Sequence, residues 1–333
     1  MEVKKIAMKQ KTSKVGTDVS RTMPTSNDMS GPNSTRPTSF EDFVWQDDII
    51  SVIQTAITSA KKSSHTLGHL LFSGASGHGK TTLAHIVAAN MWVTIKAITG
   101  YAISKPSEII SLLNNLQPGD ILFIDEIHRL KPTIEEVLYI AMEDRVIDFV
   151  MPEWGSMRLP INQFTLIGAT TKMEALASPL KNRFVYKFHF ADYTEREILG
   201  IVAHYLAHYD IIVDEPLILQ ISKKVEHTPR EIHNICVKIR DYLVAQSADG
   251  RLMMRLGDRP AFELRLQVDE GGITALHRKY MDILAAHDEP VGLTTIAAKL
   301  GMHEKAIEQD IEPLLLKLSK ICKTSRGRAL MAA

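Results

Sequence analysis

The chain has 333 residues, and its 39 lysines and arginines balance 39 aspartates and glutamates, so the formal net charge is zero. Hydrophobic residues make up 45% and charged residues 23%, which excludes a disordered chain, a collagen-like chain and a small disulfide scaffold. A neutral total also argues against nucleic-acid binding through a generally basic surface. Two cysteines, Cys236 and Cys322, form no disulfide framework, and neither a membrane-spanning run nor a signal-peptide core is evident. We therefore expect a cytoplasmic protein of two or three domains with no membrane partner.

Residues 1–37 form a polar N-terminal tail rich in Ser, Thr, Lys and Asn. Such a segment has too little apolar surface to offset the entropy of ordering, so we expect it to be disordered. Apolar residues recur at helical spacing from Ile49 to Ile57, which predicts a first helix.

Strand-like and helix-like segments alternate through residues 38–191. Short apolar strands are predicted at His69–Ser73, Ile121–Ile124 and Phe164–Ile167, and a helix from Lys80 to about Asn90. This alternation predicts an α/β fold in which helices cover both faces of a parallel sheet. Glu135 and Glu136 are expected at a solvated helix start.

Residues 192–265 have the pattern of a small helical domain, and residues 266–333 that of a winged helix. Thr194–Glu197 and Thr228–Glu231 both have capping-box spacing, the second with proline at the first helical position. Further on, helices over Thr295–Leu300 and Lys305–Leu318 are separated by a turn at Gly301, which predicts a helix-turn-helix. Cys322–Leu330 follows as a basic, hairpin-like wing.

Residues Gly74 to Thr81 (GASGHGKT) fit the phosphate-binding pattern G-x-x-x-x-G-K-[ST]. Gly74, Gly77 and Gly79 let backbone N–H groups turn toward a phosphate, and the helix starting at Lys80 adds the positive end of its dipole. Lys80 would contact the β- and γ-phosphates of ATP, and the Thr81 hydroxyl would ligate Mg²⁺. An apolar strand before the loop and an apolar helix after it argue against a chance match.

Polar residues end the strands that follow this loop. Asp125 can hold Mg²⁺, and Glu126 can accept a proton from an attacking water, although an ordinary strand end is the alternative. Thr171 ends the FTLIGATT segment and could touch the γ-phosphate or the water, with turn capping as the alternative. Arg183 could reach a neighbouring subunit's γ-phosphate, or be a solvated surface arginine.

The segment from Lys317 to Arg328 contains five basic residues and no acidic one. Gly327 allows a tight tip between Arg326 and Arg328. After a helix-turn-helix, such a patch, with Lys323, would bind DNA phosphates without reading sequence. The alternative is a solvated basic terminus.

Together these residues resemble the AAA+ ATPases and, within them, the RuvB family of Holliday-junction branch-migration motors. The resemblance extends from about Arg36 to Arg328. Segments common to many AAA+ proteins are Gly79–Met91 and Leu122–Leu130. Segments typical of the RuvB family are Glu135–Asp144 (EEVLYIAMED), Phe164–Thr171 (FTLIGATT), Ser178–Phe184 (SPLKNRF), Thr228–Arg230, Pro290–Leu293 and Thr324–Arg328.

The resemblance implies an ATP hydrolase and DNA translocase that drives branch migration of Holliday junctions in recombination and repair. It implies ATP and Mg²⁺ as cofactors and a homo-oligomeric ring, which is a hexamer in this family. It also implies as partners double-stranded DNA in a Holliday junction, a RuvA-like junction-binding protein and a RuvC-like resolvase.

The resemblance also implies individual roles. Lys80, Thr81 and Thr82 match the Walker A motif, Asp125 and Glu126 match Walker B, Thr171 matches sensor 1, and Arg183 matches the trans-acting arginine finger. Lys181 matches a nucleotide contact, Arg230 matches sensor 2, and Arg36 and Pro37 match the adenine pocket. Arg326 and Arg328 match residues that contact DNA.

Residues Asp144 to Ile161 match a hairpin that docks onto RuvA in this family, although here it is slightly shorter and carries Met151, Trp154 and Met157, for which a capped loop is the alternative to a partner site. Trp45, Lys181 and Ala191 depart from the family pattern near the nucleotide. Two other classes share part of the pattern. A clamp-loader ATPase would carry a helical collar in place of the winged helix, and an initiator-type ATPase switch would bind particular DNA sites.

Overall fold

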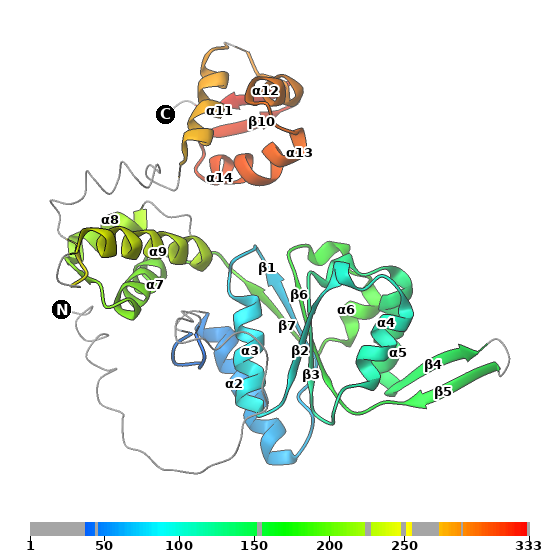
Figure 1. The fold of residues 1–333 in the computed structure, drawn as a ribbon. Coiled ribbons are helices and arrows are strands. Elements are labelled where there is room, and N and C mark those ends of the chain that lie inside the picture. Colours follow the sequence, from blue (N-terminus) through cyan, green and yellow to red (C-terminus); the bar gives the residue numbers. More distant parts are fainter. Residues whose placement is uncertain are drawn as a thin grey trace. The chain divides into compact units, whose positions relative to one another are not determined.

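A five-stranded parallel sheet forms the centre of the residues up to Asp192 (Figure 1). The computed structural model describes residues 37–43, 46–151, 155–223, 228–247, 251–254, 273–287 and 289–331. The chain divides into two compact units, one up to Asp192 and one from Tyr193 on. None of the helices in the described ranges is long and apolar enough to cross a membrane.

The strand order in the sheet is β2-β3-β6-β1-β7, and every neighbouring pair is parallel. Continuous apolar runs form the central strands because these strands are buried on both faces. The strands are β1 (Leu70–Gly74), β2 (Ile95–Thr99), β3 (Ile121–Asp125), β6 (Thr165–Thr170) and β7 (Tyr186–Phe190). Strand β6 runs beyond the predicted end at Ile167 because the residues that follow continue the pairing with β1 up to Thr170.

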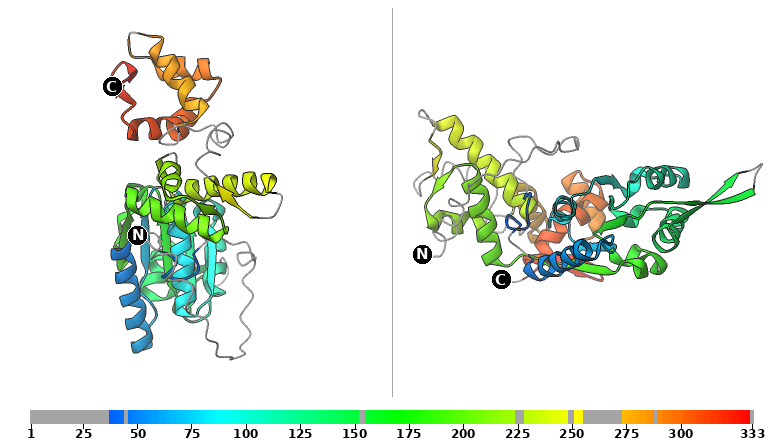
Figure 2. Two further views of the ribbon diagram at one scale, coloured as in Figure 1. Left: turned by 90° about the vertical axis from the view of Figure 1, so that its left-hand side faces the viewer. Right: turned by 90° about the horizontal axis from the view of Figure 1, so that it is seen from below.

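Helices cover both faces of this sheet, as the sequence predicted (Figures 1 and 2). Side chains alternate between the faces with a period of two, so Phe72 packs in one hydrophobic cluster and its neighbour Leu71 in the other. The first face carries α2 (Asp47–Ser63) and α3 (Lys80–Met91), and the second carries α4 (Pro106–Asn114), α5 (Pro132–Asp144) and α6 (Ser178–Arg183).

The prediction of a solvated Glu135 is wrong. Glu135 is only 6% exposed, and the backbone N–H of Ala177 donates a hydrogen bond to it. Burial raises the pKa of this carboxyl, although the Ala177 hydrogen bond and nearby Lys181 act in the opposite direction. The two-glutamate pattern could not show this, because the covering segment comes from a distant part of the sequence.

Strands β4 (Val146–Met151) and β5 (Gly155–Pro160) form an antiparallel hairpin that extends away from the sheet (Figure 1). Arg158 on β5 donates a hydrogen bond of 2.9 Å to Asp148 on β4. Trp154 and the side chains of Met151 and Met157 lie outside the described residues.

The unit from Tyr193 on begins with a helical group of α7 (Glu195–His208), α8 (Glu215–Lys223) and α9 (Pro229–Gln246). The hydroxyl of Thr194 accepts a hydrogen bond of 3.3 Å from the N–H of Glu197, whose carboxylate accepts one of 2.7 Å from the N–H of Thr194. The hydroxyl of Thr228 similarly accepts a bond from the N–H of Glu231 at 3.3 Å. Both predicted helix starts are confirmed.

The C-terminal residues form a winged helix. After α11 (Ala275–Ala285), helix α12 (Leu293–Leu300) ends at Gly301, whose φ of 68° lies in the left-handed region and turns the chain into the next helix. That next helix is continuous through α13 (Glu304–Ala306), the π-turn η6 (Ile307–Ile311) and α14 (Glu312–Lys317), and we call it the second helix of the helix-turn-helix. Strands β10 (Ile321–Thr324) and β11 (Gly327–Leu330) form the wing.

Candidate nucleotide-hydrolysis site

The predicted phosphate-binding loop joins the carboxyl end of β1 to the start of α3. Gly74, Gly77 and Gly79 all have positive φ angles, of 140°, 81° and 90°. A Cβ atom at Gly74 would lie 2.7 Å from the carbonyl oxygen of Phe190, and Gly79 is the left-handed residue from which α3 begins. These positions therefore require glycine, and the loop leads directly into a helix N-terminus, where anions bind.

The Lys80 side chain lies within this loop. The residue is 7% exposed, and its ammonium donates hydrogen bonds to the carbonyl oxygens of Gly74 at 2.9 Å and Ala75 at 2.7 Å. Both of these acceptors are neutral carbonyl groups. A phosphate oxygen is a stronger acceptor for an ammonium than a carbonyl oxygen is.

The next two predicted residues meet beside the loop. The hydroxyl of Thr81 donates a hydrogen bond of 3.4 Å to the carboxylate of Asp125, the last residue of β3. A hydroxyl and a carboxylate at this separation are hard oxygen donors of the kind that Mg²⁺ prefers. The residues present therefore fit a magnesium ion.

Glu126 is held by two side chains. Its carboxylate accepts a hydrogen bond of 3.1 Å from the Thr171 hydroxyl and lies 3.1 Å from Nδ1 of His128. Glu126 itself has a φ of 49°, which turns the backbone sharply after β3. Such a network would hold a general base in reach of its water.

Sequence reasoning missed two neighbours of Glu126: His128, which lies against its carboxylate, and Thr170, which lies against His128. His128 is almost fully buried, and its Nδ1 is also 3.0 Å from the Thr170 hydroxyl, while Nε2 has no partner among the described residues. Burial lowers the pKa of His128, although Glu126 acts in the opposite direction. A neutral ring with its proton on Nδ1 satisfies both facts, because it donates toward Glu126 and leaves no buried N–H unpaired. The position of His128, two residues after Glu126, was the available signal.

Arg183 lies at the end of α6, where it is bound within its own chain. Its guanidinium forms an ion pair with Glu143, donates a hydrogen bond of 2.9 Å to the carbonyl oxygen of Pro179, and lies 4.8 Å from the Tyr139 ring centroid. Arg183 is therefore not a freely solvated surface arginine. None of these three interactions is with the phosphate-binding loop. Lys181, on the same helix, is half-buried.

The remaining predicted nucleotide contacts come from several segments of the chain. Arg36 and Trp45 lie outside the described residues, Pro37 is half-buried, and Thr82 is half-buried on α3. Arg230 is exposed near the start of α9, in the unit from Tyr193 on.

The three predicted DNA-binding side chains of the wing differ from one another. Arg326 is exposed in the turn between β10 and β11. Arg328 and Lys323, in contrast, both form ion pairs with Glu312, at 2.7 Å and 2.6 Å.

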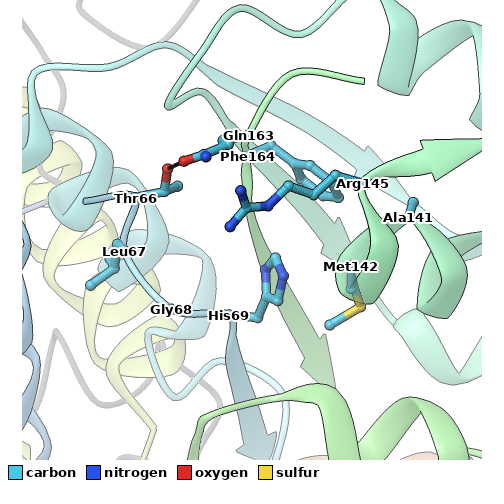
Figure 3. Close-up of a pocket in the computed structure, with 9 residues that line it drawn as sticks. All are labelled: Thr66, Leu67, Gly68, His69, Ala141, Met142, Arg145, Gln163 and Phe164. Atoms are coloured by element: carbon cyan, nitrogen blue, oxygen red, sulfur yellow. Dashed lines mark hydrogen bonds between the residues drawn. The ribbon is translucent and has the colours of Figure 1, made fainter. Parts of the chain in front are cut away.

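A cavity of about 140 Å³ lies at the opposite edge of the sheet, before the amino ends of β1 and β6 (Figure 3). Its lining includes Thr66, His69, Arg145 and Gln163, with Thr66 donating a hydrogen bond of 2.9 Å to Gln163. No residue of the predicted nucleotide site lines it.

With this geometry established, similarity to known proteins decides the family. The family model of the Holliday junction DNA helicase RuvB P-loop domain matches residues 35–190, and that of the RuvB C-terminal winged helix domain matches residues 270–333. The chain belongs to the RuvB family.

Individual RuvB proteins are similar over nearly the whole chain. The Holliday junction branch migration complex subunit RuvB of Desulfosudis oleivorans is 37% identical over 300 residues, covering 89% of this chain and 87% of the relative. The corresponding subunit of Latilactobacillus sakei is 38% identical over 304 residues, covering 90% of each. A solved structure of the Thermotoga maritima RuvB Holliday junction branch migration motor is 32% identical and superposes with a TM-score of 0.74, covering 89% of this chain and 95% of that one.

RuvB membership confirms the resemblance and the fold predicted from the sequence, a parallel α/β P-loop core followed by a helical region and a winged helix. It also identifies the chain as an ATPase of the RuvB helicase family. The clamp-loader and initiator-type alternatives are therefore set aside.

Proposed function

We propose that this chain is the ATP-driven motor of a Holliday junction branch migration complex. One observation carries the proposal: Thr81 and Asp125 present oxygen donors 3.4 Å apart, and Glu126 is held by Thr171 at the same edge of the sheet. This arrangement unites a site for a phosphate-bound cation with a base for water, the two requirements of ATP hydrolysis.

The phosphates of ATP bind in the loop formed by Gly74, Gly77 and Gly79, where Lys80 exchanges its carbonyl partners for phosphate oxygens. Thr82 and Lys181 add contacts to the nucleotide. Arg36 and Pro37 form the adenine pocket, and Arg230 contacts the nucleotide from the helical region.

Thr81 and Asp125 hold Mg²⁺, which supplies positive charge to the phosphates when bound. Glu126 accepts a proton from a water molecule whose oxygen attacks the γ-phosphorus. The bond from the γ-phosphorus to the bridging oxygen then breaks, and ADP leaves with the electron pair. Thr171 keeps the Glu126 carboxylate aimed at the water.

Arg183 completes the site of a neighbouring subunit and stabilises the charge that develops on the γ-phosphate. Because Arg183 pairs with Glu143 in its own chain, assembly of the ring exchanges that carboxylate for a phosphate. The ring is a homo-oligomer, which we infer to be a hexamer in the cytoplasm.

The wing contacts the backbone of double-stranded DNA, with Arg326 exposed at its turn and with Lys323 and Arg328 on its two strands. The β4-β5 hairpin, with Met151, Trp154 and Met157, docks on a RuvA-like protein at the junction, and a RuvC-like resolvase acts on the product.

Branch migration of a synthetic four-way junction tests the proposal. The full chain, a RuvA-like protein, ATP and Mg²⁺ should convert the junction into two duplexes, and ADP should not support the reaction. A matched Glu126→Gln variant should bind the junction complex without moving the branch point. ATP hydrolysis without any branch migration would contradict the proposed motor function.

A further inference from the structure

Glu312 is a buried carboxylate in the middle of the second helix of the helix-turn-helix, and its side chain has no exposed surface. An ionised carboxylate in such a place requires charged or hydrogen-bonding partners. It is also remote from the nucleotide site in sequence, and the hydrolysis mechanism does not use it.

Three elements supply the partners of Glu312. The hydroxyl of Tyr280 on α11 donates a hydrogen bond of 3.0 Å, and Nε of Arg328 on β11 donates one of 2.7 Å, both to Oε1. Nζ of Lys323 on β10 lies 2.6 Å from Oε2. Glu312 thus ties both strands of the wing and α11 to the second helix.

Both the side chain and the backbone of Arg328 form hydrogen bonds within the winged helix. Its Nη2 donates a hydrogen bond of 3.0 Å to Glu308, and only 15% of its side chain is exposed. Its backbone exchanges two hydrogen bonds of 2.8 Å with Val291. A guanidinium that already pairs with two carboxylates is less available to bind a phosphate.

Arg326 is the opposite case. It is exposed in the turn of the wing, and its side chain has no hydrogen-bond or ion-pair partner in the described part of the chain. The Thr324 hydroxyl accepts bonds from the N–H groups of Arg326 and Gly327, at 3.3 Å and 3.1 Å, so the turn itself is ordered.

The exposed side of the second helix has mixed charge, because Glu304, Glu308 and Asp310 are accompanied by Lys305 and Lys317, and Glu308 pairs with Arg328. This side of the helix therefore has no net positive charge to attract DNA phosphates. The wing is therefore the element of the winged helix that suits a phosphate backbone.

We propose that Glu312 and Arg328 are positioning residues for DNA binding: their ion pair fixes the wing on the second helix so that Arg326 meets the phosphate backbone. The inference rests on the proposed function, because it assumes that the wing contacts DNA. It also separates two arginines that the sequence presents as equivalent.

The variant Glu312→Gln distinguishes a positioning role of Glu312 from a simple effect of its negative charge on DNA binding. Removing a negative charge near DNA strengthens binding if only the net charge matters, whereas loss of the wing's anchor weakens it. We expect affinity of the full chain for a random-sequence duplex, with a non-hydrolysable ATP analogue, to fall by about tenfold, the effect of one lost phosphate contact at moderate salt. The matched control Asp310→Asn removes the same charge from an exposed position of the same helix and should not weaken binding.

A double-mutant cycle completes the test. Arg326→Ala should weaken binding and flatten its salt dependence, and Glu312→Gln added to it should produce no further loss. Affinity of Glu312→Gln equal to or above wild type, or additive losses, would overturn the positioning role. If Arg326→Ala has no effect, the wing–DNA contact of the proposed function fails instead.

Arg328→Lys provides a second variant in case Glu312→Gln does not fold. Lysine keeps the positive charge but cannot bond Glu312 and Glu308 through one rigid fork. A positioning role predicts that this variant binds DNA as weakly as Arg326→Ala while its circular dichroism stays native. Full DNA affinity would show that only the charge of Arg328 matters.

Discussion

The hydroxyl of Thr171 donates a hydrogen bond of 3.1 Å to the carboxylate of Glu126, joining the ends of two neighbouring strands of the sheet. Thr171 follows β6 and Glu126 follows β3, so the carboxyl ends of paired parallel strands bring the two residues together. The adjacent Thr170 is fully buried and faces His128. The strand period thus directs Thr171 toward Glu126 and Thr170 toward His128.

Glu126→Gln should retain ATP binding and lose at least about 100-fold in turnover, because the amide cannot accept the proton of the attacking water. Single-turnover hydrolysis and equilibrium nucleotide binding measure the two effects separately. Normal turnover in this variant would contradict the assignment of Glu126 as the base.

Thr171→Val should lower kcat by about 10- to 150-fold, since a hydrogen bond to a charged group contributes about 1.5–3 kcal/mol. Affinity for ATP should change little, because Thr171 contacts Glu126 and not the phosphate-binding loop. Thr171→Ser, which keeps the hydroxyl, is the matched control and should retain most activity. Equal losses in both variants would point to a packing role.

His128→Phe should also lower kcat, because Glu126 loses its second side-chain partner. His128→Asn retains an N–H donor near the position of Nδ1 and should recover part of the rate. A steady-state comparison of the two variants, with thermal unfolding as a control for folding, tests this support role. Wild-type kcat in His128→Phe would remove His128 from the site.

Arg183→Ala and Lys80→Ala subunits should each be inactive alone and regain part of the ATPase activity when mixed. In a ring, one variant supplies an intact phosphate-binding loop and the other supplies the intact arginine. ATPase activity across a series of mixing ratios measures this recovery. Absence of any recovery would argue that Arg183 acts within its own subunit.

His69 should make the protein less stable in mild acid. Burial lowers the pKa of His69 to about 4 from 6.5, and its Nδ1 accepts a hydrogen bond of 2.8 Å from the N–H of Leu166, which leaves no room for a second ring proton. Between pH 6.5 and about 4 the unfolded state binds the proton and the folded state does not, so the free energy of unfolding falls as the pH is lowered through this window.

In urea unfolding, the free energy of unfolding of the variant His69→Gln should fall less across that pH window than that of wild type. This comparison does not depend on how much the substitution lowers stability at neutral pH. His65→Gln, at an exposed position nearby, is the control and should keep the wild-type pH dependence. Identical pH profiles for wild type and His69→Gln would show that His69 is not the responsible group.

Most of the architecture follows from local patterns. Three features depend only on residues close together in the sequence: the apolar strand runs, the glycines of the phosphate-binding loop and the threonine caps. Each is found where the sequence predicted it. The bond between Thr171 and Glu126 also follows from strand order, once parallel pairing of β3 and β6 is known.

By itself, the sequence determined the phosphate-binding loop, the acidic strand end, the helix-turn-helix and the basic wing, because spacing along the chain defines them. Only the tertiary structure decided which of these charges are available. Glu135 is buried, His128 supports Glu126, and Arg328 is bound to Glu312 while Arg326 is exposed. The physical reason is that burial and ion pairing depend on segments that are distant in sequence and meet only when the helices and strands pack together.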